Sequence, residues 1–288
     1  MGFVLLTVLS SLAISLILKF NETRSGDRIA VAGANYVVAA ALGLILSDPF
    51  SSGSPALPDP GWIAFGALTG IGFVAGFLLL MRSMKEIGLA VTASVARTAT
   101  LGPVLLSILF YNERPGIIEI TGVGIGLLAF LMLGIAQRKP GNQFSLNLPA
   151  LILLGSVLAV MILNDFAMKI TQSNNVPEAS FLLIVFGVAG LLCWGTILAR
   201  STTQKRTLQK RDVMLGAALG IPNYFSSYFL ILALKNIPAS TVFPIVSASG
   251  VVASTLAAVL IWKERPSPTA WIGIGLATLA VILLGAGQ

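Results

Sequence analysis

Apolar segments of membrane-crossing length fill almost the whole chain, and they constrain the fold more than any other feature of the sequence. A helix that crosses the hydrocarbon core of a bilayer needs about 20 predominantly apolar residues. Of the 288 residues, 56% are hydrophobic and only 10% are charged. We therefore expect an all-α integral membrane protein with ten transmembrane helices and no soluble domain. The ten segments are residues 2–18, 29–47, 62–81, 88–111, 116–136, 148–170, 179–199, 213–234, 239–262 and 270–285.

The residue types that are missing or rare exclude several kinds of chemistry. The chain has no histidine, and its one cysteine, Cys193, lies in an apolar run. A zinc site, a histidine relay and an internal disulfide are therefore not expected. No nucleophile, base and orienting group stand together in the sequence, so it does not predict an enzyme. We expect neither a metal nor a cofactor.

The positive charge of the chain indicates how it is oriented in a membrane. The net charge is +7, and its basic residues lie mostly in short loops beside the apolar segments. The loops after the first, third, fifth, seventh and ninth segments hold 14 Lys or Arg, whereas the opposite side holds three, counting Lys169 at the end of the sixth segment. Basic loops stay in the cytoplasm. We expect a multi-pass protein of a bacterial cytoplasmic (inner) membrane with both chain ends outside, and no nucleic acid partner.

The two halves of the chain are related in sequence. Matches at a shift of 150 positions, and of 151 after one inserted residue, run through the apolar segments. Matched charged residues carry more weight than matched glycines, because small apolar residues coincide by chance in membrane sequences. We predict a first five-helix repeat at 1–137, a cytoplasmic connecting loop at 138–147 and a second five-helix repeat at 148–288. The matches include Lys19 with Lys169, Gly66 and Gly70 with Gly216 and Gly220, and Glu113, Arg114 and Pro115 with Glu264, Arg265 and Pro266.

An odd number of spans in each repeat has a consequence for topology. The second half then enters the membrane upside down relative to the first. Inverted repeats of this kind are the architecture of many secondary transporters, which open a midplane site to each side in turn. The repeat therefore predicts alternating access.

Two ionisable residues lie well inside predicted spans, where each is costly unless it is paired or hydrated. Arg97 lies about 13 Å along the span 88–111, close to mid-membrane. Asp165 is the only acidic residue well inside a span, and it is the candidate for coupling transport to a proton. In a pathway role, Arg97 binds an anionic group of the cargo and Asp165 binds an ammonium group or exchanges a proton. The alternative is a buried structural pair.

Polar residues inside other spans are further candidates for lining a pathway. Pro222 and Pro244 each free a backbone carbonyl within a span, which often happens beside a cavity. Ordinary hydrogen bonds between helices explain any single one of these polar residues equally well. The candidates are Asn35, Tyr36, Asn164, Asn223, Tyr224, Ser227 and Ser247.

Two other features have structural explanations. Lys19 and Lys169 lie at helix ends, where lysine can extend its ammonium group to the membrane interface, so both are predicted to be anchors. The glycine pairs at 66 and 70 and at 216 and 220 have the four-residue spacing that lets helices pack closely.

The order of these features resembles a known family. Each half has a lysine at the end of its first helix, glycines in its third, a proline in its fourth followed by Glu-Arg, and a glycine-rich fifth. With Asn35-Tyr36 and Asn164-Asp165, nearly the entire chain resembles the EamA-type permeases of the drug/metabolite transporter superfamily. The resemblance implies a ten-helix basket whose cavity is lined by spans one to four and six to nine. It also implies export or import of small metabolites or drugs, commonly by proton coupling or exchange.

The resemblance leaves the cargo open. Related small multidrug antiporters use a glutamate in their first helix, where this chain offers only serines, so Asp165 is the substitute to test. The leading hypothesis is a secondary transporter of a small polar or zwitterionic, amino-acid-like metabolite, with protons as a candidate coupling ion. Efflux of apolar cationic drugs is an alternative that a central arginine disfavours. A membrane enzyme or lipid-handling scaffold is an alternative of another class. A monomer and a homodimer both fit the sequence.

Overall fold

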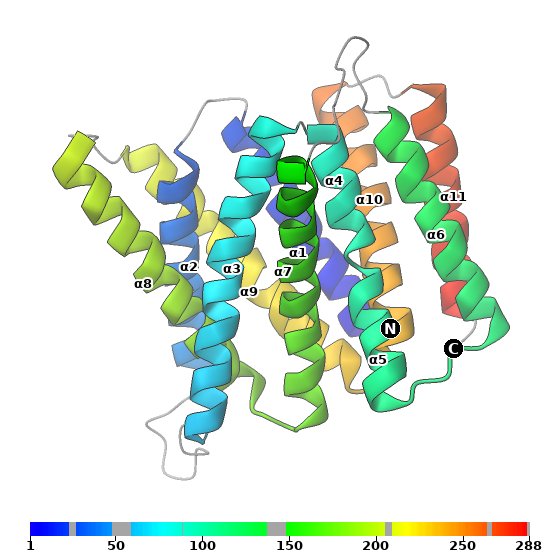
Figure 1. Cartoon of the computed structure of the whole chain (residues 1–288), viewed down its shortest axis with the longest axis horizontal. Coiled ribbons are helices and arrows are strands. Elements are labelled where there is room, and N and C mark those ends of the chain that lie inside the picture. Colours follow the sequence, from blue (N-terminus) through cyan, green and yellow to red (C-terminus); the bar gives the residue numbers. More distant parts are fainter. Residues whose placement is uncertain are drawn as a thin grey trace. The chain divides into compact units, whose positions relative to one another are not determined.

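The secondary structure of the described residues is entirely helical (Figure 1). The structure, a computed structural model, describes residues 1–22, 27–47, 59–87, 89–136, 148–204, 209–263 and 267–286. Its helices are α1 (Gly2–Glu22), α2 (Arg28–Ser47), α3 (Pro60–Glu86), α4 (Leu89–Thr98), α5 (Leu101–Tyr111), α6 (Ile117–Ala136), α7 (Leu148–Ser173), α8 (Glu178–Gln204), α9 (Lys210–Leu234), α10 (Ala239–Trp262) and α11 (Pro268–Ala286).

Many of these helices have the length and composition of membrane spans. Within the described ranges, seven are long and apolar enough to cross a bilayer, namely α2, α3, α7, α8, α9, α10 and α11. Shorter apolar stretches lie at Gly2–Leu18, Leu101–Tyr111 and Ile117–Leu133. The protein is therefore a multi-pass, all-α membrane protein as far as it is described, while the total of ten spans stays a prediction.

The predicted fourth span, residues 88–111, is divided into two helices. Helix α4 ends at Thr98 and α5 begins at Leu101. Proline has no N–H, and its ring collides with the carbonyl four residues earlier, which for Pro103 is that of Ala99. The backbone turns more tightly at this point, where the N–H of Gly102 bonds to the Ala99 carbonyl at 2.9 Å. Pro222 and Pro244, in contrast, lie inside α9 and α10.

The chain separates into two compact units that both draw on distant parts of the sequence. Unit 1 comprises Met1–Val74 and Ile170–Lys235. Unit 2 comprises Ala75–Lys169 and Asn236–Gln288. Each unit thus combines helices from before and after the chain midpoint.

In unit 1, α2 packs between α8 and α9. A Cβ atom added at Gly43 would lie 3.1 Å from Cβ of Leu183, and one added at Gly33 would lie 3.7 Å from Cβ of Cys193. These contacts show that α2 and α8 run antiparallel. Helix α9 runs parallel to α2, and the buried Asp212 carboxylate near its start accepts the N–H of Asp27, just before α2, at 2.9 Å.

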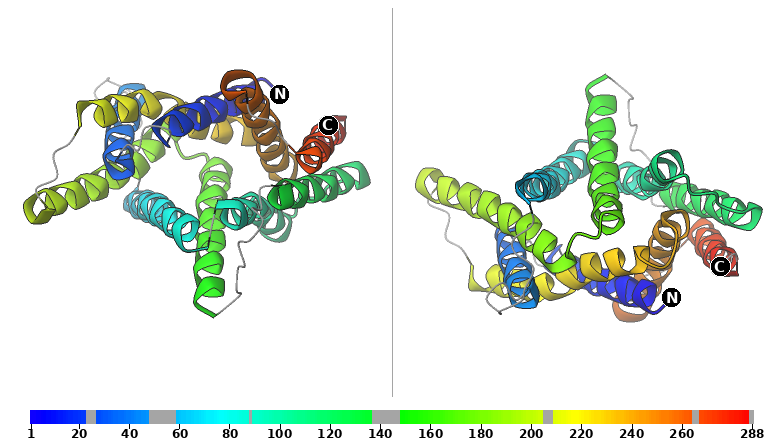
Figure 2. Two further views of the ribbon diagram at one scale, coloured as in Figure 1. Left: turned by 90° about the horizontal axis from the view of Figure 1, so that it is seen from above. Right: turned by 90° about the horizontal axis from the view of Figure 1, so that it is seen from below.

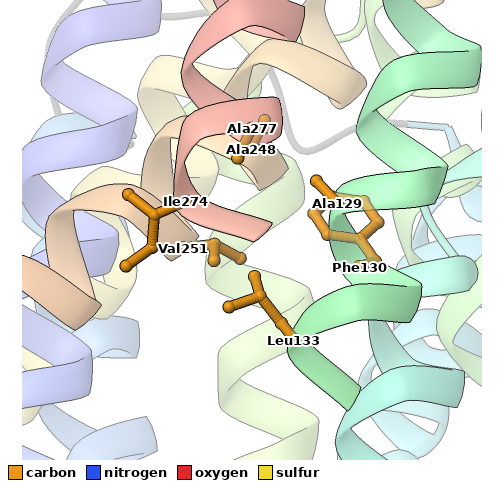
Figure 3. Close-up of a cluster of buried hydrophobic side chains, with 7 residues drawn as sticks. All are labelled: Ala129, Phe130, Leu133, Ala248, Val251, Ile274 and Ala277. Atoms are coloured by element: carbon orange, nitrogen blue, oxygen red, sulfur yellow. The ribbon is translucent and has the colours of Figure 1, made fainter. Parts of the chain in front are cut away.

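In unit 2, α6 and α11 lie side by side and run antiparallel (Figures 1 and 2). A Cβ atom at Gly122 would lie 2.8 Å from the Leu284 side chain, and one at Gly273 would lie 2.7 Å from the Leu133 side chain. Both helices also contact α10. Their shared apolar cluster, drawn in Figure 3, consists of Ala129, Phe130, Leu133, Ala248, Val251, Ile274 and Ala277.

The glycine contacts follow the same numerical shifts as the sequence matches. In unit 2, Gly122 meets Ala280 and Leu284, while Gly273 meets Ala129 and Leu133, each 151 positions away from its counterpart. The contacts of unit 1 follow a shift of 150. There Gly66 meets Phe181 and Ile184, Gly70 meets Val185 and Val188, Gly216 meets Val31 and Ala34, and Gly220 meets Asn35 and Val38.

Large apolar side chains also cover outer surfaces of the helices. Leu109 in α5, Leu191 in α8 and Leu260 in α10 are 75%, 76% and 78% exposed. A soluble monomer rarely exposes large contiguous apolar patches. Acyl chains of a bilayer are the solvent that fits such surfaces.

Candidate functional site

The predicted site residues fall into both units. Unit 1 contains Asn35 and Tyr36 on α2 and Asn223, Tyr224 and Ser227 on α9. Unit 2 contains the remaining predicted residues. These are Arg97 on α4, Asn164 and Asp165 on α7, and Ser247 on α10.

Asp165 is a carboxylate inside an apolar helix without a polar partner in the described part of the chain. It lies in α7, and its side chain is neither fully buried nor fully exposed. None of the described residues donates a hydrogen bond to it or forms an ion pair with it. Its neighbour Asn164 faces α3, since a Cβ atom at Gly76 would lie 3.5 Å from the Asn164 Nδ2 atom. At membrane depth, an unpaired carboxylate requires a proton, water or a cationic ligand.

Arg97 lies in the last turn of α4, directly before the break in the predicted fourth span. Its side chain lies outside the described residues. The predicted binding of a cargo anion by Arg97 therefore stays a prediction. What the structure adds is its backbone position, two residues before the interruption at Ala99 and Thr100.

Ser247 forms a hydrogen bond with the segment between α4 and α5. The Thr100 hydroxyl donates a hydrogen bond to the Ser247 hydroxyl oxygen at 3.1 Å. A small cavity next to Thr100 is lined almost entirely by apolar groups, including Pro244, Phe130 and Leu284. This contact has the character of an interhelical hydrogen bond, the structural alternative considered for the polar residues.

Two of the unit 1 candidates, Tyr36 and Tyr224, belong to a row of aromatic rings. The rings of Tyr36 and Phe186 are stacked with centroids 6.1 Å apart, and Phe186 is 6.2 Å from Tyr224. Tyr224 is in turn stacked on Tyr228 at 5.8 Å. The row joins α2, α8 and α9. Within it, the Tyr36 and Tyr224 side chains are buried.

Among the described residues of unit 1, two buried side-chain atoms have no hydrogen-bond partner. They are Oδ1 of Asn35 and the hydroxyl oxygen of Tyr224. Asn35 is 5% exposed and Tyr224 is fully buried. Asn223 and Ser227, on the same helix, are partly exposed. Each unsatisfied buried group costs stability, so it requires an explanation such as bound water or a functional contact.

Sequence reasoning missed an ion pair that fixes the start of α10. Glu113, in the loop after α5, accepts the N–H groups of Ala239 and Ser240, both at 3.0 Å. It also pairs with Lys169 of α7 at 3.1 Å, and the two side chains are only 11% and 10% exposed. The prediction that Lys169 is an interfacial anchor is therefore wrong, because its ammonium group lies in this buried ion pair. The side chain of its repeat mate, Lys19, lies outside the described residues.

The electrostatics of Glu113 follow from these contacts. Burial alone would raise the pKa of this carboxyl group, but the two amide donors and the Lys169 ammonium group hold the pKa below its ordinary value. Glu119 contacts the same end of α10, where it accepts the Thr241 hydroxyl at 3.1 Å, and it caps its own helix by accepting the N–H of Gly116. The Glu-Arg-Pro match was the only signal that marked Glu113, and it gave no partner.

A comparison with known families identifies the chain. The model of the EamA-like transporter family matches residues 1–135 and 148–286. This chain belongs to the EamA-like transporter family. The predicted resemblance is confirmed, and with it the general class of membrane transporter.

Individual relatives of this EamA-like protein are distant. An uncharacterized protein of Haemophilus influenzae is 23% identical over 96% of this chain and 95% of its own length. A putative sugar uptake protein of Listeria monocytogenes is 23% identical, covering 76% of this chain and 75% of that protein. A probable 4-amino-4-deoxy-L-arabinose-phosphoundecaprenol flippase subunit ArnE of Salmonella paratyphi C is 31% identical over 36% of this chain and 91% of its own.

A solved crystal structure has the same fold. It aligns with a TM-score of 0.77 over 99% of this chain and 97% of that chain, at 18% sequence identity. At that level of identity, the similarity concerns the arrangement of the helices only.

Proposed function

We propose that this EamA-like protein is a secondary transporter that moves a small polar metabolite by alternating access between two inverted repeats. Residues 1–137 and 148–288 form the repeats, and residues 138–147 form the cytoplasmic loop between them. Two observations support the inversion. The repeat mates α2 and α8 pack antiparallel in unit 1, as α6 and α11 do in unit 2. In addition, glycines at equivalent positions of the two halves contact equivalent residues of the opposite half.

The observation that carries the proposal is the Asp165 carboxylate inside α7. A structural carboxylate in an apolar helix is normally paired or hydrogen-bonded. In the described part of the chain Asp165 has no such partner, which leaves it available to a cargo ammonium group or a proton. Asp165 is therefore the coupling or cargo-binding residue of the proposal, and Asn164 lies beside it.

We expect a zwitterionic, amino-acid-like cargo, because the proposed site has one acidic and one basic residue, Asp165 and Arg97. In the proposal, Arg97 binds the anionic group of the cargo, and the other predicted residues, Asn35, Tyr36, Asn223, Tyr224, Ser227 and Ser247, stay candidates for contact with the cargo. The names of two relatives contain a sugar and an amino sugar. Sugars and amino sugars therefore belong in the cargo panel beside amino acids.

Uptake by purified protein in proteoliposomes tests the proposal. A panel of radiolabelled amino acids, sugars and amino sugars is tested with and without a pH gradient. Asp165→Asn keeps the size of the side chain and removes its charge, so it is expected to lower uptake of the cargo at least about tenfold. Glu86→Gln is the matched control, because this carboxylate is exposed and pairs with Arg82 at the helix surface.

The two variants separate a specific site from a general loss of charge. Glu86→Gln is expected to transport at the wild-type rate. Full uptake by Asp165→Asn would refute the assigned role of Asp165. Conversion of a panel compound into a new product, without movement of the intact compound, would refute transport itself.

A further inference from the structure

Lys169 lies within reach of two carboxylates of unit 2. In this structure its ammonium group is 3.1 Å from Glu113 and 5.4 Å from the centre of the Tyr111 ring. Asp165 is four residues before Lys169 on α7. Residues at i and i+4 of a helix share a face with Cβ atoms about 5–6 Å apart, and an acidic residue four positions before a lysine is the favourable order for an ion pair.

Lys169 supplies one positive charge for two carboxylates. One ammonium group can fully neutralise either Glu113 or Asp165, but not both. In the described conformation Glu113 has three donors, namely Lys169 and the N–H groups of Ala239 and Ser240. Asp165 has none among the described residues. The cation therefore compensates one carboxylate and leaves the other unpaired.

From this arrangement we infer that Lys169 is an exchangeable cation that pairs with Glu113 in one state of the transporter and with Asp165 in another. This inference rests on the proposed role of Asp165 in transport. When Asp165 carries a proton or a cargo ammonium group, Lys169 stays with Glu113 and helps to hold the start of α10. When Asp165 is empty and ionised, Lys169 moves to it, and Glu113 holds α10 by its two amide contacts alone.

The exchange has two consequences for a transport cycle. It removes the cost of an empty, uncompensated carboxylate inside the membrane during the return step. It also links occupancy of Asp165 to the contact between the α5–α6 loop and the N-terminus of α10. The end of α5 is held close to this site, because Phe110 and Tyr111 pack on Phe166 with centroids 6.2 and 6.1 Å apart.

The helices next to α7 carry other ionisable groups, and the test must leave them unchanged. Helix α7 contacts α5 through Ile162 at Gly102, and α3 through Asn164 at Gly76. The ionisable groups on these elements and on α4, between them in the chain, are Arg82, Lys85, Glu86, Arg97 and Tyr111.

Dicyclohexylcarbodiimide, which modifies carboxyl groups in apolar surroundings only when they are protonated, reports the state of Asp165 without any cargo. The purified protein is treated at fixed pH, and the modified peptide is quantified by mass spectrometry. Asp165→Asn identifies the labelled position. Glu113→Gln releases Lys169 to Asp165. Because a neighbouring cation favours an ionised carboxylate by about tenfold or more, labelling of Asp165 is expected to fall about tenfold.

The double variant Glu113→Gln/Lys169→Met decides the inference. It lacks the cation, so labelling is expected to return at least to the wild-type level, which simple disruption of the α10 contact would not produce. Wild-type labelling of Glu113→Gln, or labelling of the double variant as low as that of Glu113→Gln, would overturn the exchange.

A second pair of variants covers the case in which Glu113→Gln does not fold, as judged by its melting temperature. Glu113→Asp keeps the charge and shortens the side chain, so an intermediate loss of labelling is expected, again reversed by Lys169→Met. No loss in Glu113→Asp would overturn the exchange. The proposed transport function fails separately, through retained uptake by Asp165→Asn, whatever the labelling shows.

Discussion

The sequence predicts the surroundings of some residues, because these depend only on the helix that holds the residue. It does not predict the surroundings of residues that contact a distant loop. Asp165 was singled out because it is charged within an apolar segment, and this holds for any folded form of the helix. Lys169, only four residues later, was predicted to reach the interface. In the structure it pairs with Glu113, which lies in the loop after α5, far earlier in the chain. The sequence carries no geometric signal for that pair.

The unsatisfied hydroxyl of Tyr224 leads to a prediction about stability. Because this buried hydroxyl has no partner among the described residues, Tyr224→Phe is expected to stabilise the protein by about 1 kcal/mol or to leave it unchanged. Thr241→Val serves as the control of opposite sign, since it removes the hydrogen bond to Glu119 and should cost about 1 kcal/mol. Thermal unfolding in detergent measures both, and a loss of stability in Tyr224→Phe as large as that in Thr241→Val would contradict the prediction.

The lengths of the apolar segments and the spacing of the glycines were sufficient to predict most of the helices. They did not predict which helix would be interrupted. Pro222 and Pro244 were expected to free a carbonyl, yet α9 and α10 continue through them, whereas the fourth span is interrupted just before Pro103. Whether a helix breaks depends on which neighbours satisfy the freed carbonyl. Those neighbours belong to other helices, so sequence alone could not distinguish the three cases.

Gly220 provides a test of packing at the scale of helix pairs. A Cβ atom there would lie 2.6 Å from Cβ of Val38 and 2.7 Å from the carbonyl oxygen of Asn35. Gly220→Ala is therefore expected to push α9 away from α2 and to cost about 1–3 kcal/mol. Gly195→Ala in α8 is the matched control, because no atom lies within 4 Å of the added methyl group. Equal melting temperatures for the two variants would show that this close approach is unimportant.

For the whole molecule, sequence reasoning predicted the class and the family, and it left the assembly of the helices open. Membrane composition, the repeat and the positions of lysine, proline and glycine were enough to predict an EamA-like protein, which the family match confirms. Nothing in the sequence showed that each compact unit would combine helices from both halves. Such exchange depends on contacts between distant segments, which the order of apolar segments does not encode.

The inverted arrangement itself is testable by topology in cells. Reporter domains that are active on only one side of the membrane are fused before Met1, within residues 138–147 and after Gln288. Five spans per repeat place the two ends on the same side and the connecting loop on the other, and the basic loops predict that the ends are outside. An even number of spans per half would instead place all three reporters on one side. That result would leave the antiparallel packing of α6 against α11 without a topological basis, because repeat mates in parallel halves point the same way.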